Sequence, residues 1–212
     1  MTEMTMVLQQ PQQPYIKQCH EVVFRFCEYD RSYGNYDCVP VTEDSVLRVE
    51  EIELAYRMGA RFPRSLIQVL IDRADTIRKA LSQISPTIII FDEKIPWQAL
   101  ESLFKACIMP RLNTANITKI LHKKRPQLIP ILDSIVVQKY LEPLVHPHIP
   151  TAPEERMVLY IKQLKRDAEF NREVLIEIQK RLVAQGKLGL SPIRVLDILI
   201  WTYFSRPEWL FL

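Results

Sequence analysis

Asp133 is the residue with the clearest chemical potential in this sequence. It follows a stretch, residues 111–132, that contains five cations and no carboxylate. An acid placed after such a run either pairs with one of the cations or is kept for chemistry. Asp133 is therefore the candidate catalytic carboxylate. The alternative is a helix N-cap that pairs with Arg125 or Lys124, because aspartate is among the favoured capping residues.

The cations before Asp133 are candidates for contacts with nucleic-acid phosphates. The sequence PRLN at 110–113 predicts a short turn between two helices, with Asn113 in the left-handed conformation. The next helix would begin near Thr114, and its free N–H groups beside Arg111 would form a phosphate seat. Solvated helix surface is the alternative for the lysines that follow. The predicted nucleic-acid-binding residues are Arg111, Asn113, Thr114, Lys119, Lys123, Lys124 and Arg125.

Four further residues are candidates for lining a pocket: His122, Tyr140, Asp197 and Trp201. Asp197 lies in the apolar run IRVLDILIW, so it needs a partner, and Arg194 one turn earlier is the local candidate. An ion pair that braces the last helix is one interpretation, and a lining position beside Asp133 is the other. Tyr140 and Trp201 are either core residues or an aromatic sandwich for an extruded base. His122 lies between cations and is either a surface histidine or a hydrogen-bond donor.

Composition narrows the class of protein. Four glycines and fifteen prolines disfavour tight-turned sheets and glycine-rich phosphate loops. The four cysteines form no C-x-x-C pair, and no carboxylate or cysteine motif completes a site around His146 and His148. We therefore expect no metal and no cofactor. No apolar run reaches the ~20 residues needed to span a membrane, and the N-terminus has an acid where a signal peptide needs a base. We expect a cytoplasmic protein with no membrane contact.

The elements that must position these side chains are predicted to be helices. Apolar residues recur at helical spacing before Tyr29, before Gly59, from Pro63 to Leu81 and after Pro96. Further helices are expected after Asp133, after a Thr151 cap, over 170–184 and after Ser191–Pro192. The run PTIIIF at 86–91 is expected to be an extended connector, since no second strand answers it.

The predicted organisation is an all-α domain preceded by a short arm. Residues 1–14 repeat glutamine and proline and offer few apolar anchors, so we expect a flexible N-terminal arm. Residues 15–212 would form a single domain. Two lobes within it are the alternative, one from 15–95 with 190–212 and a hairpin lobe from 96–189.

Two segments of the sequence resemble the helix-hairpin-helix DNA glycosylases. That family has an L-P-G-V-G-x-K-T-A hairpin, then a helix, a loop and a P-V/I-D-T/S-x-V/I segment with the catalytic aspartate. Residues 109–113, MPRLN, lie over the hairpin, and residues 130–136, PILDSIV, lie over the aspartate segment with one inserted residue. The separation of the two segments is close to that in the family. The resemblance implies a helix-hairpin-helix glycosylase-like fold and DNA as partner.

The resemblance also assigns roles. It implies that Asp133 stabilises an oxocarbenium-like sugar while water attacks, which releases the base. Arg111 and Asn113 replace both hairpin glycines, and Ala115 stands where bifunctional members have a Schiff-base lysine. The implied enzyme is therefore monofunctional, a DNA N-glycosylase without a lyase step.

A second resemblance covers most of the chain from about residue 20. A family of uncharacterised bacterial proteins has the hallmarks K-L-L-x-R/K-K-R-P-x-L-I/V-P-V/I-x-D and L-R-x-L-D-V/I-x-x-W. Here they read KILHKKRPQLIPILD at 119–133 and IRVLDILIW at 193–201. This chain is similar to that family, which is known as a domain of unknown function and implies no activity.

Three functions remain open from the sequence. The first is a glycosylase-like protein that binds DNA and removes a modified base with Asp133. The second is a non-catalytic module on the same fold that binds nucleic acid or a protein. The third is a small-molecule enzyme on an unrelated helical scaffold. A deep pocket beside Asp133 would separate these possibilities best.

Overall fold

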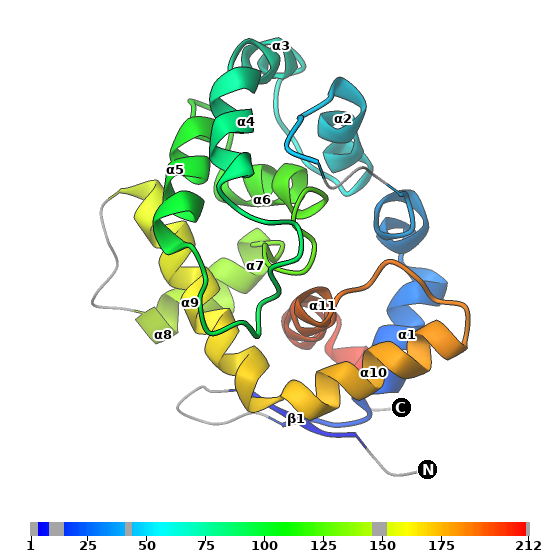
Figure 1. Ribbon diagram of the computed structural model, residues 1–212. Helices are drawn as coiled ribbons and strands as arrows, with labels where there is room; N and C mark the ends of the chain where they lie inside the picture. Colours follow the sequence, from blue (N-terminus) through cyan, green and yellow to red (C-terminus); the bar gives the residue numbers. More distant parts are fainter. Residues whose placement is uncertain (1–3, 9–14, 41–43, 146–151, 211–212) are drawn as a thin grey trace.

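The computed structural model describes residues 4–8, 15–40, 44–145 and 152–210. Within these residues the chain is mostly helical, with a single two-stranded antiparallel sheet (Figure 1). The predicted all-α class is confirmed. The elements in chain order are β1 Met6–Val7, β2 Tyr15–Ile16, α1 Cys19–Tyr29, the π-helical turn η1 Tyr33–Asp37, α2 Val49–Arg57, α3 Ser65–Asp72, α4 Ala74–Ser82, α5 Trp97–Cys107, α6 Thr114–His122, α7 Ser134–Val136, the π-helical turn η2 Val137–Leu141, α8 Glu142–Val145, α9 Pro153–Phe170, α10 Arg172–Ala184, α11 Pro192–Ser205 and the 3₁₀ turn η3 Pro207–Leu210.

The N-terminal segment 4–8 is packed, although it lies inside the predicted flexible arm. Met6 and Leu8 are fully buried, and Met6–Val7 pairs with Tyr15–Ile16. The backbone of Val7 exchanges two hydrogen bonds with the side chain of Asn171, between α9 and α10. Met4, Met6 and Leu8 alternate at the spacing of a strand, which explains how so short a segment finds a place in the core.

Helix α2 ends at Arg57, and Gly59 closes it in the left-handed conformation, as predicted. This glycine has φ 74°, and the next amide, that of Ala60, donates to the carbonyl of Ala55. The predicted continuous helix from Pro63 to Leu81 is instead divided into α3 and α4 at Arg73, which has φ −93° and ψ 3°. The guanidinium of Arg73 donates to the carbonyl of Ile108, 3.0 Å away, beyond the end of α5. The division therefore leaves Arg73 in a position to cap that helix end.

The turn at 109–112 differs in detail from the prediction. Leu112 donates its amide to the carbonyl of Met109, and Arg111 has φ 67°. Proline at the second position and a positive φ at the third describe a type II turn. Asn113 was expected to be left-handed, but it has φ −83° and ψ 169° and caps α6 with its side chain. The prediction chose the wrong residue because asparagine is the commoner non-glycine at such positions.

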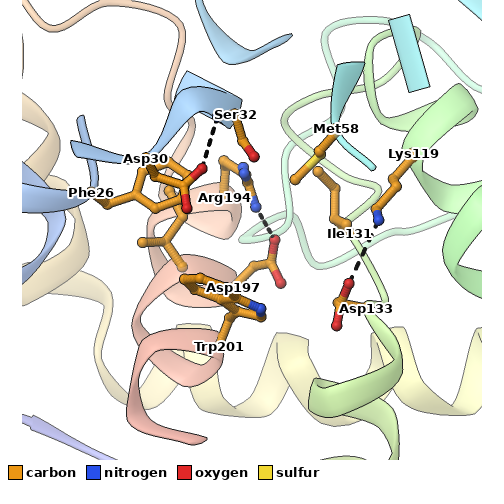
Figure 2. A pocket seen from close by; sticks show the side chains of 11 residues that line it. Phe26, Asp30, Ser32, Met58, Lys119, Ile131, Asp133, Arg194, Asp197 and Trp201 are labelled. Atoms are coloured by element: carbon orange, nitrogen blue, oxygen red, sulfur yellow. Dashed lines mark hydrogen bonds and ion pairs between the residues drawn. The ribbon is translucent and has the colours of Figure 1, made fainter. Parts of the chain in front are cut away.

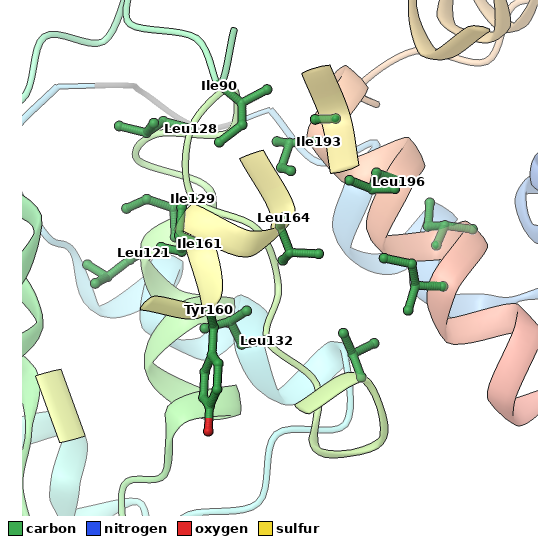
Figure 3. Close-up of a cluster of buried hydrophobic side chains, with 14 of the residues drawn as sticks. Ile90, Leu121, Leu128, Ile129, Leu132, Tyr160, Ile161, Leu164, Ile193 and Leu196 are labelled. Carbon is green, nitrogen blue, oxygen red and sulfur yellow. The ribbon is translucent and has the colours of Figure 1, made fainter. Parts of the chain in front are cut away.

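The last helices complete the core (Figure 3). Apolar side chains of α6 and the loop after it meet those of α9 and α11, and the labelled members include Leu121, Leu132, Ile161, Leu164 and Leu196. As predicted, α11 begins at a Ser191 cap, whose Oγ accepts from the amide of Arg194, and it is buried on most sides. The predicted Thr151 cap lies outside the described residues. The division into two lobes stays a prediction.

The segment 86–91, which was predicted to be a connector, lies between α4 and α5. Residues 86–91 form no strand, and the amide of Ile90 donates to the carbonyl of Gln127 in the loop after α6. The segment is a connector as predicted, but it is not extended, because the amides of Ile88 and Asp92 donate to the carbonyls of Ser85 and Ile89 in two turns. The Ile90 bond ties it to the segment that precedes Asp133. None of the helices in the described ranges combines the length and apolar character that crossing a membrane requires.

Candidate active site

A cavity of about 120 Å³ opens beside Asp133. Figure 2 shows its two walls, one from α1 and α11 and the other from the end of α2, from α6 and from the segment before α7. Carboxylates and cations from both walls therefore face one space. The lining residues are Phe26, Asp30, Ser32, Met58, Lys119, Ile131, Asp133, Arg194, Asp197, Ile198 and Trp201.

Asp133 caps a helix, which is one of its two predicted roles, and it also lines the cavity. It is the N-cap of α7, with Oδ1 accepting from the amide of Ile135 at 3.0 Å. Its Oδ2 lies 3.6 Å from Nζ of Lys119, so its cation is Lys119 and not the predicted Arg125 or Lys124. The side chain keeps 24% of its exposure, while Lys119 keeps 8%. The cap fixes one oxygen, and the carboxylate still reaches the cavity.

Asp197 belongs to a buried charge cluster at the cavity wall that α1 and α11 form. Arg194 donates to Asp197 at 2.5 Å along α11 and to both oxygens of Asp37 at 2.9 and 3.0 Å. All three side chains are almost fully buried. The structure thus contains the predicted Arg194–Asp197 ion pair and also places Asp197 in the lining. Asp37, delivered by η1, is a partner that sequence reasoning missed, because it lies 157 positions from Arg194.

The cluster contains two carboxylates and one guanidinium, and this excess of acid affects the protonation of Asp197. Burial raises the pKa of Asp197 to about 7, against the lowering influence of Arg194, and the charges of Asp133 and Asp37 add to the rise. A buried site with one cation and two carboxylates disfavours the second negative charge. Burial therefore favours the protonated form of Asp197 at pH values where an exposed aspartate is ionised.

Aromatic and apolar side chains form the rest of the lining. Trp201 lies one turn beyond Asp197 on α11, and its ring meets that of Phe26 edge-on at 6.3 Å. Met58 and Ile131 face them from the opposite wall (Figure 2). An apolar lining with a few charged groups is typical of a small-molecule or base-binding site. Of the aromatic candidates, the structure places Trp201 in the lining.

The structure does not place the cations at 123–125 on an accessible surface. Lys123 donates to the carbonyls of Asp37 and Val39, and Lys124 pairs with Glu51 at 2.5 Å. Arg125 donates to the carbonyls of Ile84 and Leu81, both at 2.7 Å. Each side chain is at most 6% exposed. These cations hold distant segments together, and neither a phosphate clamp nor a solvated helix surface describes them.

His122 and Tyr140 also lie in the interior and outside the cavity lining. The ring of His122 donates to the carbonyl of Ile129, with Nδ1 2.6 Å from the oxygen, and burial lowers its pKa to about 3. His122 is therefore neutral and not a surface histidine. Tyr140 is fully buried, with its ring 6.3 Å from that of Phe204.

The remaining predicted phosphate contacts lie around the start of α6. Arg111 and Asn113 are exposed and Thr114 is half-buried. The Asn113 side chain accepts from the amide of Asn116 at 2.9 Å, which satisfies one of the free helix N–H groups. Arg111, Asn113 and Thr114 are not among the residues that line the cavity.

The described residues contain no group of three or more His, Cys, Asp or Glu side chains arranged to hold a metal ion. His146 and His148 lie outside these residues. The charged groups offered by the cavity are three carboxylates, Asp30, Asp133 and Asp197, and two cations, Lys119 and Arg194.

Comparison with known proteins gives one match. The model of a protein family described as "Family of unknown function (DUF6308)" matches residues 31–204. The chain belongs to this family. The DUF6308 match includes most of the cavity lining, from Ser32 to Trp201, but begins after Phe26 and Asp30. No curated protein and no solved structure matches the chain significantly.

Proposed function

We propose that this DUF6308 protein is a DNA-binding, glycosylase-like hydrolase, and that the cavity beside Asp133 is its active site. The observation that carries the proposal is that two of the three carboxylates in one cavity lie in different surroundings. Asp133 lies beside Lys119 at its partly exposed rim, whereas Asp197 is buried and has a pKa raised to about 7. A buried acid that favours its protonated form and a partly exposed acid beside a cation are suited to opposite roles in hydrolysis.

The reaction would divide between these acids. Hydrolysis of an N-glycosidic bond breaks the bond between C1′ and the base nitrogen and forms a bond from C1′ to a water oxygen. The departing base takes up a proton, which protonated Asp197 can supply, and the water loses one, which Asp133 can accept. The negative charge of Asp133 also stabilises the oxocarbenium-like sugar. Trp201 and Phe26 supply aromatic surface for an extruded base.

The turn before α6 supports the DNA-binding part of the proposal. In glycosylase hairpins glycines stand at this turn, and here Arg111 occupies one of those positions with φ 67°. The backbone therefore adopts a conformation that favours glycine even though the side chain is a cation. The replaced glycine does not remove the turn, and it adds a positive charge at the surface.

Asp133→Asn tests catalysis. Asparagine caps a helix as well as aspartate, so the fold should persist while the charge at the sugar is lost. We expect base release from duplexes that carry a panel of modified bases to fall about 100-fold or more, with duplex affinity unchanged. Asp75→Asn, an exposed acid in α4 outside the cavity, is the matched control and should act like the parent.

A non-catalytic binding module is the second candidate. The cap and the Lys119 pair give Asp133 a structural role that needs no reaction. If the parent protein releases no base from any duplex of the panel while it binds DNA, catalysis is overturned and this module is the function.

A further inference from the structure

Three arginines at the end of α2 and in its connection to α3 lie outside the cavity lining. Arg57, Arg61 and Arg64 are exposed, and no hydrogen bond or ion pair of their guanidinium groups is found among the described residues. No carboxylate occurs from 54 to 71. Elsewhere, exposed arginines such as Arg78 have acidic neighbours in their own helix. These three cations therefore form an unneutralised charged segment.

The connection is held in a fixed shape. Gly59 makes the left-handed turn after α2, and the hydroxyl of Tyr56 donates to the carbonyl of Phe62 at 2.8 Å. The rings of Tyr56 and Phe62 lie 4.5 Å apart. A cationic loop whose backbone is already ordered loses little entropy when it binds a polyanion.

This segment also adjoins the hairpin and the cavity. The side-chain amide of Asn116, in the first turn of α6, donates to the carbonyl of Arg61 at 3.3 Å. Residues 102–132, which include Arg111, contain no carboxylate either, so two acid-free segments meet at this contact. Met58, directly after Arg57, lines the cavity (Figure 2).

We propose that Arg57, Arg61 and Arg64 form a second contact surface for the sugar-phosphate backbone of double-stranded DNA, next to the Arg111 turn and leading to the cavity. This inference rests on the proposed function, which supplies DNA as the partner. A backbone is favoured over an acidic protein because the segment exposes three cations while its large apolar side chains are turned inward: Phe62 is buried and Met58 faces the cavity.

The test is a triple variant, Arg57→Gln, Arg61→Gln and Arg64→Gln, titrated with a fluorescent DNA duplex at several salt concentrations. We expect about 10- to 100-fold weaker binding at low salt, and a log–log salt slope smaller by about 2–3, because each lost phosphate contact removes about one unit. The matched control is Arg166→Gln, Arg172→Gln and Lys180→Gln, which removes three exposed cations from α9 and α10. It should bind as the parent does.

The outcomes separate the two proposals. If the triple variant binds DNA like the parent, or if polyglutamate competes as well as DNA at equal charge, the second surface is overturned. Tighter binding of an RNA duplex than of the DNA duplex overturns the DNA assignment. If only the triple variant loses binding but the parent releases no base, the surface stands and the catalytic proposal fails.

Discussion

Two groups of cations in this protein have opposite surroundings. Lys123, Lys124 and Arg125 are consecutive, and their side chains are buried and bonded to backbone carbonyls and acids. Arg57 and Arg111 are scattered in sequence, and their side chains are exposed near the start of α6. The run that looks most basic in the sequence is therefore internal structure, and the scattered arginines supply the accessible charge. Charge density along a chain does not show which charges face solvent.

Substitutions in the buried group of cations should lower the free energy of unfolding the most. Arg125 is 1% exposed, and its guanidinium bridges the carbonyls of Leu81 and Ile84 to the loop after α6. Arg125→Met would remove a buried cation and leave those carbonyls without a donor. We expect a loss of about 3–5 kcal/mol in the free energy of unfolding, measured by urea denaturation.

Arg61→Met is the matched test on the exposed group. Its guanidinium has no bond within the described residues, so the change should stay within about 0.5 kcal/mol. Equal losses of stability in the two variants would remove the distinction between the buried and the exposed cations.

Arg194 differs from Lys124 because both of its acidic partners are almost fully buried, and this should appear in the pH dependence of stability. The pKa of Asp197 is about 7 in the folded state and near 4 when unfolded, so the folded protein holds the extra proton between those values. The contribution of Asp197 to stability should therefore fall as pH rises from 4 to 8, while that of His122, whose pKa is lowered to about 3, rises over part of the same range. We expect the stability of Asp197→Asn to gain about 1–3 kcal/mol relative to the parent as pH rises over that range, measured by urea denaturation at each pH.

The prediction is contradicted if stability changes with pH in Asp197→Asn as it does in the parent. If Asp37→Asn alone alters that pH dependence, Asp37 is the acid of the cluster that holds the proton. Because the two acids share Arg194, comparing the slopes is more informative than comparing stabilities at one pH.

A small gain in stability is expected at the turn. Arg111 has φ 67°, a conformation that costs a non-glycine residue about 1–2 kcal/mol, while glycine loses about 0.5–1 kcal/mol more chain entropy. Arg111→Gly should therefore raise the free energy of unfolding by about 0.5–1 kcal/mol and weaken binding of the duplex. Asn113→Gly, where φ is −83°, should give no such gain.

Local signals in the sequence predicted much of the fold. Gly59, Pro96 and Ser191 stand at helix ends where their backbone or capping preference places them. The division at Arg73 was missed because the apolar stripe continues through it. The strand at 6–7 was missed because two residues, read beside a glutamine-rich stretch, carry too little pattern.

The candidate site was harder to predict from the sequence than the fold was. Asp133 stood out as an acid after a cationic stretch, Asp197 as an acid inside an apolar run and Trp201 as an aromatic residue of the same run, and the structure brings them to one cavity. Phe26 and Met58 follow ordinary helical spacing, so nothing separates them from core residues before the chain is folded. Burial of the cations at 123–125 depends on acids and carbonyls about 40 to 90 positions earlier, which local patterns cannot show.

The distance along the chain between Asp37 and Arg194 has a consequence for synthesis. A ribosome makes the chain from its N-terminus at roughly 5–20 residues per second. The 157 positions between the two residues therefore correspond to roughly 8–30 s in which Asp37 exists without its arginine. During that interval a nascent chain lacks α11 and therefore lacks the part of the cavity wall that α11 supplies. The site is thus a late product of translation, and a chain stopped before Pro192 would lack it altogether.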